Sequence, residues 1–295
     1  MRSSANRWSI GWSLACLVAV CWMWSGAAEG QEKIKGQRVF YTGHSFHMFV
    51  VPKVEQLVKS AGISDHKLLG SQSIGGSRVH QHWDLPAEKN NAKKALATGQ
   101  VDVFTMAPHL EIPDRGIDSF FELALKHNPN TRLMIQASWA PWDSIAGGQR
   151  IFRNDQRDQT NLAALQSGID TWRKQMEAQT DALNEKAGKK VVYIVPVGDA
   201  VMKLRKMVVD GKFPGVRRQS ALFSDTIGHG LAHVQALTAY CNFCAIYGCT
   251  VEGLSLKENG VTDEQHAILQ RIAWETVSQY PYAGVKKPEA AAVGN

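Results

Sequence analysis

"YTGHSFHMF" at residues 41–49 joins a short β-like run, residues 38–41, to a segment with helical periodicity. A small residue, a histidine, a serine and an aromatic residue therefore stand where a parallel strand should end. Two roles are open to Ser45, since serine is a preferred helix cap and also a nucleophile when a base lies beside it. The rest of the chain bears on which role it has.

Strand-like and helix-like segments alternate along the chain. Strands that alternate with helices indicate a parallel sheet with helices on both faces. We therefore predict an α/β protein with a three-layer α/β/α architecture and a five-stranded parallel, flavodoxin-like sheet. The expected strands are 37–42, 67–72, 101–106, 132–137 and 191–197, and the expected helices are 49–61, 86–98, 116–127, 160–187, 199–210 and 230–247.

The composition is that of an ordinary globular protein, with 295 residues, 44% of them hydrophobic and 20% charged. The formal net charge of +6 is not gathered into basic runs interleaved with aromatic residues, so we expect no nucleic-acid partner. The sequence has neither a dinucleotide fingerprint nor a Walker-type phosphate loop, so we expect no organic cofactor.

The first 28 residues differ from the rest of the chain. Arg2 and Arg7 precede an apolar run at 10–24 and then small residues, a pattern typical of a secretory signal. We expect a signal peptide at 1–28, cut near Ala28, and a secreted or periplasmic protein with no other membrane contact. An uncleaved membrane anchor is the alternative, because the apolar run is near the lower length limit for spanning a bilayer.

Three cysteines remain after the expected signal, in the stretch "YCNFCAIYGCT". Cys241, Cys244 and Cys249 permit one disulfide with a leftover thiol. A metal site is a further alternative, although no complementary Cys or His pair with ligand spacing lies nearby. We favour small buried cysteines on the last helix.

Polar residues collect after the strands, where open α/β sheets bind their ligands. A parallel sheet brings all of these strand ends to one edge, so the segments are expected to converge. They are Gly43, His44, Ser45 and His47 after the first strand, Ser73, Gly75, Gly76, Ser77, His80 and His82 after the second, Pro108, His109 and Glu111 after the third, and Asp225, His229 and His233 before the helix at 230–247.

This constellation resembles the SGNH, or GDSL-type, hydrolases, a family of secreted esterases, over residues 37–250. Gly43-His44-Ser45-Phe46 stands where the family has its G-x-S nucleophile segment, and Gly75 and Gly76 match its second glycine block. Asp225 and His229 match the closing Asp–His pair. The expected organisation is an SGNH-hydrolase-like domain at 35–255, a helical extension at 256–280 and a disordered tail at 281–295.

The resemblance implies an ester hydrolase that forms an acyl-enzyme. Ser45 would attack, His229 would take its proton and Asp225 would orient the imidazole. The amides of Ser45 and Gly76, with Gly75, would bind the oxyanion. These are the catalytic residues and the oxyanion hole that we predict.

Two features depart from the family pattern. The third block normally supplies an asparagine to the oxyanion hole, whereas "TMAPHLE" at 105–111 has none, so we expect His109 or backbone amides to serve instead. The closing pair is one residue longer than the usual D-x-x-H. Gly228 can absorb this residue, because glycine accepts backbone angles that other residues do not.

A long connection at 138–158 follows the fourth strand, and such loops are usually functional. We expect Trp139, Trp142 and Arg150 of this loop, together with His82, to bind the substrate. Aromatic rings beside an active site stack well on sugars, so the expected substrate is a small-molecule or saccharide ester, with a carbohydrate O-acetyl ester as the specific guess.

Three alternatives stay open at this stage. The histidines at the predicted edge are also metal ligands, which allows a metal-binding protein or a metal-assisted hydrolase. The absent asparagine allows a non-catalytic saccharide-binding module on the same fold. Finally, His233 lies one helical turn after His229 and competes with it for the role of base.

Overall fold

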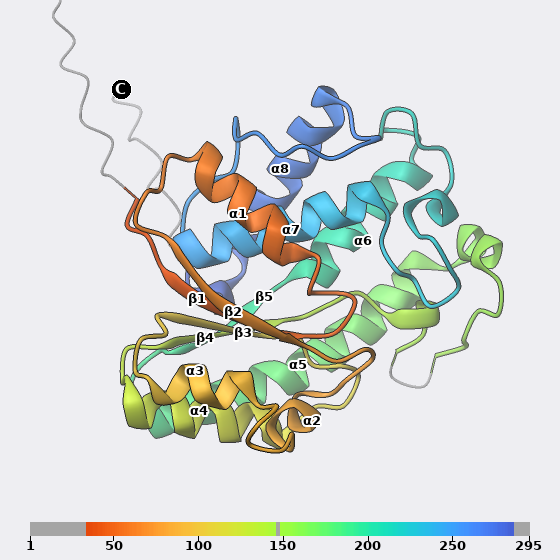
Figure 1. Cartoon of the computed structure of the whole chain (residues 1–295). Helices are drawn as coiled ribbons and strands as arrows, with labels where there is room; N and C mark the ends of the chain where they lie inside the picture. The colour runs from red at the N-terminus through yellow and green to blue at the C-terminus, as the bar shows by residue number, and fades with distance from the viewer. Residues whose placement is uncertain (1–33, 146–147, 286–295) are drawn as a thin grey trace, which may run out of the picture. The chain divides into compact units, whose positions relative to one another are not determined.

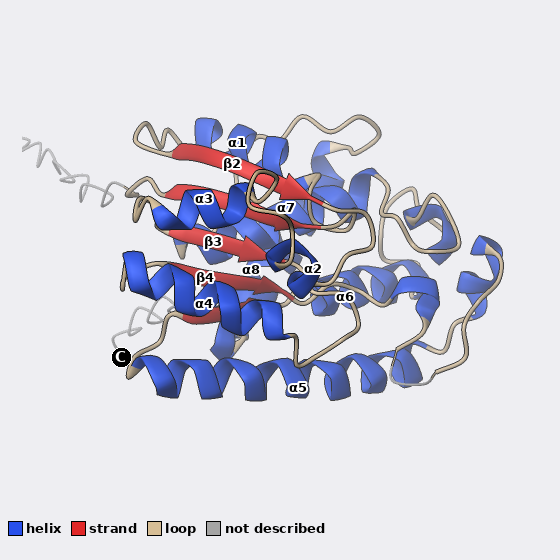
Figure 2. Ribbon diagram, turned by 60° about the horizontal axis from the view of Figure 1, so that its bottom comes forward, coloured by secondary structure: helices blue, strands red, loops and turns tan. Residues whose placement is uncertain are grey.

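The computed structural model describes residues 34–145 and 148–285 (Figure 1). It contains a parallel sheet in the strand order β2-β1-β3-β4-β5, and Figure 2 shows these strands side by side and running in one direction. This is the order of a flavodoxin-like sheet, so the predicted fold class is confirmed. The strands are β1 (Arg38–Gly43), β2 (Lys67–Ser73), β3 (Val103–Met106), β4 (Arg132–Gln136) and β5 (Val192–Val195).

Helices lie on both sides of the sheet, as Figure 1 shows. In the described part of the chain, no helix is long and apolar enough to cross a membrane. On one side are α1 (Val50–Ser60), α6 (Val197–Val209), α7 (Ala232–Tyr247) and α8 (Asp263–Gln279), and on the other α2 (Val79–Trp83), α3 (Asn91–Ala97), α4 (Arg115–His127) and α5 (Leu162–Ala187). The short 3-10 helices are η1 (Pro141–Asp143), η2 (Asn154–Gln159), η3 (Gln219–Leu222) and η4 (Pro281–Ala283).

Strands β1, β3, β4 and β5 are buried on both faces of the sheet, whereas the edge strand β2 is largely exposed. Successive side chains of a strand point to opposite sides of the sheet. Val39 and Tyr41 of β1 belong to the hydrophobic core on the side of α1 and α7. Phe40 points the other way and stacks on Phe104 of β3, with 5.9 Å between the ring centroids. Each face of the sheet therefore has its own hydrophobic core. In sequence, the buried strands β1, β3, β4 and β5 are nearly continuous hydrophobic runs.

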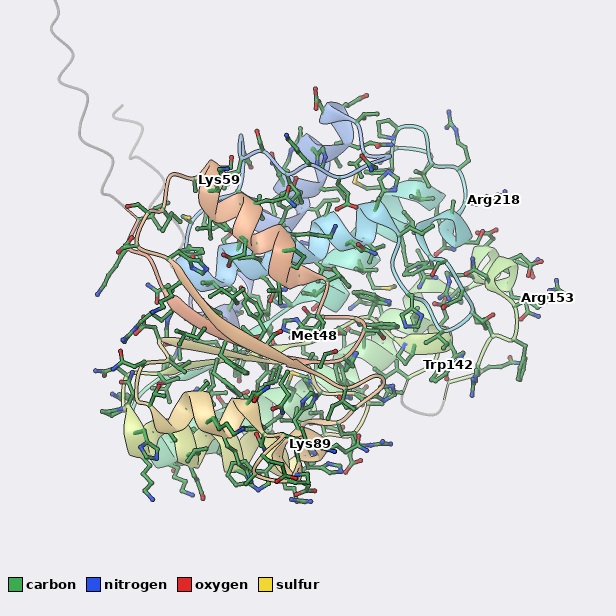
Figure 3. The ribbon with its side chains drawn as sticks, viewed as in Figure 1. Met48, Lys59, Lys89, Trp142, Arg153 and Arg218 are labelled. Carbon is green, nitrogen blue, oxygen red and sulfur yellow. The ribbon has the colours of Figure 1, made fainter. Side chains whose placement is uncertain are left out.

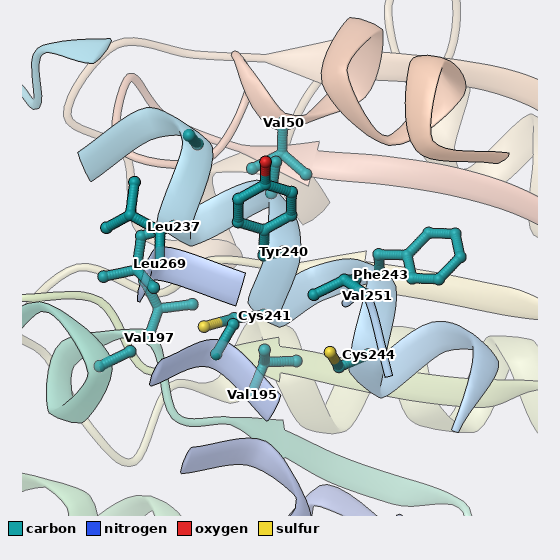
Figure 4. Close-up of a cluster of buried hydrophobic side chains, with 14 of the residues drawn as sticks. Val50, Val195, Val197, Leu237, Tyr240, Cys241, Phe243, Cys244, Val251 and Leu269 are labelled. Carbon is teal, nitrogen blue, oxygen red and sulfur yellow. The ribbon is translucent and has the colours of Figure 1, made fainter. Parts of the chain in front are cut away.

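Two of the three cysteines are buried in α7. Figure 4 shows Cys241 and Cys244 among hydrophobic neighbours such as Val195 and Leu237. Burial raises the pKa of both thiols above its usual value, which leaves them protonated and unreactive. All three cysteines are free, so the interpretation as small buried residues is confirmed for these two, whereas half-buried Cys249 follows the helix.

The predicted start of the helix expected at 86–98 is wrong. The chain instead forms the short helix α2 and then α3, which begins only at Asn91. The side chain of Asn90 explains the break, because it caps α3 by accepting from the amide of Lys93 at 3.0 Å. Its amide group also donates to the carbonyl of His82 at 2.9 Å, which ties the end of α2 to the start of α3.

The expectation of disorder from residue 281 is wrong for residues 281–285. After α8, η4 follows directly, with Ala283 buried. The Tyr282 hydroxyl donates to the carboxylate of Asp181 at 2.8 Å. These contacts hold the chain against α5 as far as residue 285. Residues 286–295 and the expected signal peptide at 1–28 lie outside the described residues.

One buried carboxylate joins α2 to α4. Asp114 is the N-cap of α4 and accepts from the amide of Gly116 at 2.8 Å. It also accepts from the amides of Val79 and His80 at 2.7 and 2.9 Å. A Cβ at Gly116 would lie only 2.2 Å from the backbone nitrogen of His80, so the two helices meet at a glycine.

Asp114→Ala is expected to lower the free energy of unfolding by about 3 kcal/mol, because it removes a cap and leaves buried amides without acceptors. Urea unfolding followed by circular dichroism measures the loss. Asp155→Ala, which removes an exposed carboxylate paired with Arg153, is the matched control and should leave stability nearly unchanged. Equal effects of the two substitutions would contradict this role for Asp114.

Candidate functional site

Three side chains that are far apart in the sequence meet at the carboxyl ends of the strands. Ser45 Oγ lies 2.8 Å from His229 Nε2, and His229 Nδ1 lies 2.6 Å from Asp225 Oδ2. Ser45 follows β1, whereas the other two residues belong to the loop before α7. A hydroxyl, an imidazole and a carboxylate in this order form an arrangement in which a base can activate a nucleophile. The structure thus brings the three predicted catalytic residues together.

The turn that carries Ser45 lies between β1 and α1. The amide of Met48 donates to the carbonyl of His44 at 3.0 Å, which closes the turn. Helix α1 begins only at Val50, with Phe49 as its N-cap. Ser45 is exposed and lies four residues before that cap, so the N-cap interpretation of this serine is wrong.

A buried polar network lies behind this turn. His47 was expected at the ligand edge but is fully buried, and its Nδ1 donates to the side-chain oxygen of Gln136 at 2.7 Å. The Thr105 hydroxyl donates to His47 Nε2 at 2.9 Å. Gln136 in turn donates to the carbonyl of Phe46 at 2.9 Å and accepts from Asn242 at 3.0 Å. Through Gln136, His47 therefore holds the backbone of the turn in position. The prediction that His47 lies at the ligand edge of the sheet is wrong.

The loop that carries the base is closed by its own carboxylate. Asp225 Oδ1 accepts from the amides of Gly228 and His229 at 2.9 and 3.1 Å. Gly228 has a φ of +101°, an angle that favours glycine. This glycine accommodates the extra residue of the loop. Burial alone would raise the pKa of Asp225, but the hydrogen bonds from the His229 ring and from the two amides outweigh it and lower this pKa. Asp225 is therefore anionic when it faces the imidazole.

The connection at 138–158 holds the same loop from outside. The amide of Trp142, the indole N–H of Trp139 and the guanidinium of Arg157 all donate to backbone carbonyls of residues 225–228, at 2.8 to 3.2 Å. Figure 3 labels Trp142 on this connection. The segment that sequence reasoning assigned to substrate selection thus also positions the imidazole.

A buried charge cluster anchors this connection. Asp143 binds both Arg157 and Arg205, with Arg205 Nη2 at 2.6 Å, and also accepts from the Thr160 hydroxyl at 2.6 Å. Both guanidinium groups are almost completely buried. Trp142 and Asp143 have φ values of +54° and +50°, which are strained for residues other than glycine. The cluster holds this strained pair in place and so fixes the direction of the Trp142 side chain.

Unpaired backbone amides surround Ser45. Among the described residues, the amides of Ser45, Gly75 and Gly76 donate to no protein group, and all three residues line one pocket. Gly76 has a φ of +60°, in the left-handed region that favours glycine. The ring of His109 lines the same pocket, and burial together with the charge of Arg78 lowers its pKa. The predicted oxyanion-hole residues therefore lie on the same pocket as the serine.

The pocket beside Ser45 has a volume of about 380 Å³. Trp139 and Trp142 line it, as predicted. Arg150 does not, because its guanidinium covers the Trp142 ring at 3.8 Å from the centroid. His82, which was predicted to bind the substrate, lies outside the pocket lining. Its side chain is 1% exposed and hydrogen-bonds the Ser77 hydroxyl at 2.8 Å.

Sequence reasoning missed several walls of the pocket. Trp172 of α5 lines it together with Leu110 and Ile227. Trp172 has the helical spacing of a core residue, so no local signal distinguished it from its neighbours. Leu110 and Ile227 lie beside predicted site residues, and that adjacency was the only clue available.

The histidines do not converge as a metal site would require. His233 Nε2 bonds Gln265 at 3.1 Å, so His229 and not His233 faces Ser45. His80 lies 3.5 Å from the Asp114 carboxylate, away from the other rings. Within 34–145 and 148–285, no group of three His, Cys, Asp or Glu residues is arranged to hold a metal ion. The shared strand edge therefore does not bring these imidazoles together into one donor set.

No protein-family model and no curated protein matches the sequence. Among solved structures, the chain is similar to a DUF4886 family protein from Bacteroides uniformis, with 16% identity, 83% of this chain and 95% of that chain covered, and a TM-score of 0.53. It also matches a provisionally assigned SGNH hydrolase from Slackia heliotrinireducens (16% identity, 70% and 97% covered, TM-score 0.43) and a family 3 carbohydrate esterase from Clostridium thermocellum (14%, 56% and 79%, TM-score 0.36). At these identities the similarities concern the fold alone, and the three-layer α/β/α fold class predicted from the sequence is confirmed.

Arg157→Lys is expected to lower the free energy of unfolding by about 3 kcal/mol. Lysine keeps the charge beside Asp143 but lacks the planar fork that also reaches the carbonyls of residues 225 and 226. Arg153→Lys, at the exposed start of η2, is the control and should leave stability nearly unchanged. Urea denaturation of both variants decides the matter, and equal midpoints would contradict the assignment.

The buried histidines predict an acid-sensitive fold. Burial lowers the pKa of His47 and of His82 to about 4, against about 6.5 in an unfolded chain. Between these values the unfolded chain takes up protons that the folded protein excludes. Stability is therefore full above pH 6.5 and falls as the pH drops towards 4. We expect the free energy of unfolding to fall by about 2 kcal/mol per histidine between pH 7 and pH 5.

Urea unfolding at the two pH values measures this slope. His47→Gln should flatten it, whereas His127→Gln, at an exposed position, should leave it unchanged. A slope that is the same in all three proteins would show that the buried imidazole does not cause it.

Proposed function

We propose that the protein is a serine hydrolase that cleaves ester bonds through an acyl-enzyme. The observation that carries this proposal is the continuous hydrogen-bonded series from Ser45 through His229 to Asp225. Ser45 is exposed beside a pocket, and unpaired amides line the same pocket. Nucleophile, base and oxyanion donors thus stand within reach of one carbonyl group.

In the first step, Ser45 Oγ forms a bond to the ester carbonyl carbon while its proton passes to His229 Nε2. Asp225 accepts from the other ring nitrogen, so it holds the imidazole in position and stabilises the imidazolium. When the tetrahedral intermediate collapses, the bond to the alcohol oxygen breaks and His229 returns the proton to that oxygen. Water repeats the sequence on the acyl-enzyme and releases the acid.

The amides of Ser45 and Gly76 would stabilise the negative charge on the carbonyl oxygen. In place of the usual asparagine, the His109 ring is the side-chain donor available on the pocket wall. The lowered pKa keeps this imidazole neutral, so it offers one N–H without the charge of an imidazolium. Because one donor of this kind is typically worth about 3 kcal/mol in the transition state, this exchange bears on the rate more than on the reaction type.

Secretion belongs to this proposal, whereas the carbohydrate O-acetyl ester expected from the sequence does not. Secretion rests on residues 1–28, which lie outside the described part of the chain. The sequence predicts a saccharide because exposed tryptophan rings stack on sugars. In the structure, however, Trp139 is 3% exposed and stacks on Phe46, with 4.6 Å between the ring centroids. The structure favours an ester substrate in general.

Hydrolysis of p-nitrophenyl acetate is expected in the wild-type protein and should fall at least about 1,000-fold in Ser45→Ala, because the nucleophile is lost. Ser119→Ala, in α4 and outside the pocket lining, is the matched control and should keep full activity. A serine-directed phosphonate should inactivate the wild type, and a chelator should not.

Activity that survives Ser45→Ala, or that a chelator abolishes, would contradict the serine mechanism and favour the metal-assisted alternative. A stably folded wild type that turns over no ester would favour the non-catalytic binding module.

A further inference from the structure

The pocket beside Ser45 has walls that are almost entirely hydrophobic. Its side chains come from five segments that the fold brings together: the turn after β1, the loop after β3, the connection after β4, helix α5 and the loop before α7. A volume of about 380 Å³ lies within the range of roughly 300–1,000 Å³ typical of small-molecule sites, far more than a two-carbon acetyl group fills. Its hydrophobic walls are Phe46, Leu110, Trp139, Trp142, Trp172 and Ile227.

Two indole N–H groups and one hydroxyl around the pocket already have partners. The indole N–H of Trp139 donates to the carbonyl of Gly228 at 2.8 Å, and that of Trp172 donates to the carbonyl of Leu110 at 3.2 Å. The Ser138 hydroxyl accepts from Gln136 at 2.8 Å. A sugar in this pocket would bring several hydroxyl groups out of water and find few partners beyond the three unpaired amides and the rings of His44 and His109, so most of this burial is unfavourable.

The aromatic walls are held in fixed positions. The Phe46 and Trp139 rings stack at an interplanar angle of 11°. Trp142 is fixed through its amide to the carbonyl of Ile227 at 2.9 Å, and the guanidinium of Arg150 covers one face of its ring. Rigid rings bind a planar partner without losing further conformational freedom, which favours a flat hydrophobic group over a flexible chain.

From these observations we propose that the pocket binds a bulky hydrophobic group of the ester, best an aromatic ring, and not a saccharide. This inference rests on the proposed function, since it names the substrate of the same serine. The ring occupies the cavity between Trp172 and the Phe46–Trp139 pair, and the ester carbonyl lies against Ser45. The polar half of the substrate stays in solvent.

The test compares non-activated esters under identical conditions by pH-stat titration. Benzyl acetate carries the ring on the alcohol, methyl 3-phenylpropanoate carries it on the acyl group, and ethyl acetate and an acetylated methyl xyloside carry none. We expect kcat/KM for at least one aromatic ester to exceed that of ethyl acetate and of the xyloside by roughly tenfold to a hundredfold, mainly through KM. Equal values, or a preference for the xyloside, would overturn the inference.

Trp172→Ala is expected to remove most of this preference, because it takes away one aromatic wall. Trp274→Ala, in α8 on the other side of the sheet, is the control and should keep the preference unchanged. A preference that persists in a folded Trp172→Ala variant would overturn the assignment of this wall. If that variant does not fold, Leu110→Glu tests the same wall and should reduce the preference as well.

Binding separates this inference from the proposed function. Ser45→Ala cannot form an acyl-enzyme but keeps the pocket, so methyl 3-phenylpropanoate should quench its tryptophan fluorescence saturably, and the acetylated xyloside should not. Such binding without any hydrolysis by the wild type would contradict the serine mechanism and leave the pocket assignment intact. Hydrolysis of ethyl acetate without aromatic binding would do the reverse.

Discussion

Two arginines packed around one buried carboxylate form the interaction on which the site depends. Arg157 and Arg205 share Asp143, and one positive charge in the cluster remains without a carboxylate. The backbone carbonyls of residues 225 and 226 accept hydrogen bonds from Arg157, and their dipoles partly compensate this unpaired charge. A buried guanidinium loses much stability when such acceptors leave it, so the loop is restrained and its imidazole stays beside Ser45.

The turn that carries Ser45 is restrained from the opposite side by a neutral network. His47 is kept uncharged by burial and joins Gln136, which also reaches the carbonyl of Phe46 and the side chain of Asn242. Fully satisfied polar groups in a core are rigid, because breaking any one bond leaves another unpaired. Serine and imidazole are thus placed by two independent clusters, one charged and one neutral, and the 2.8 Å distance between them depends on both.

Hydrophobic periodicity located every strand and most helices, because a sheet buried on both faces leaves a clear pattern in the sequence. It failed where side-chain contacts set a boundary. The helix expected at 86–98 is broken by the Asn90 cap, and the chain at 281–285 is held by the bond from Tyr282 to Asp181. Ser45, Asp225 and His229 were predicted from the resemblance to the SGNH hydrolases. They meet in the structure because parallel strands bring their carboxyl ends to one edge and the Asp225–His229 spacing is local.

The sequence by itself determined the layer architecture, the edge at which the chemistry collects and the identity of the serine, carboxylate and imidazole there. Tertiary structure alone decided which polar residues of that edge face the pocket and which are buried, as with His109 against His47. It also decided the roles of Arg157 and Trp172, whose partners lie 68 and 62 residues away in the chain. The physical reason is that burial and hydrogen bonding are properties of a packed neighbourhood, whereas a sequence pattern reports only which residues a single strand or helix turns to one side.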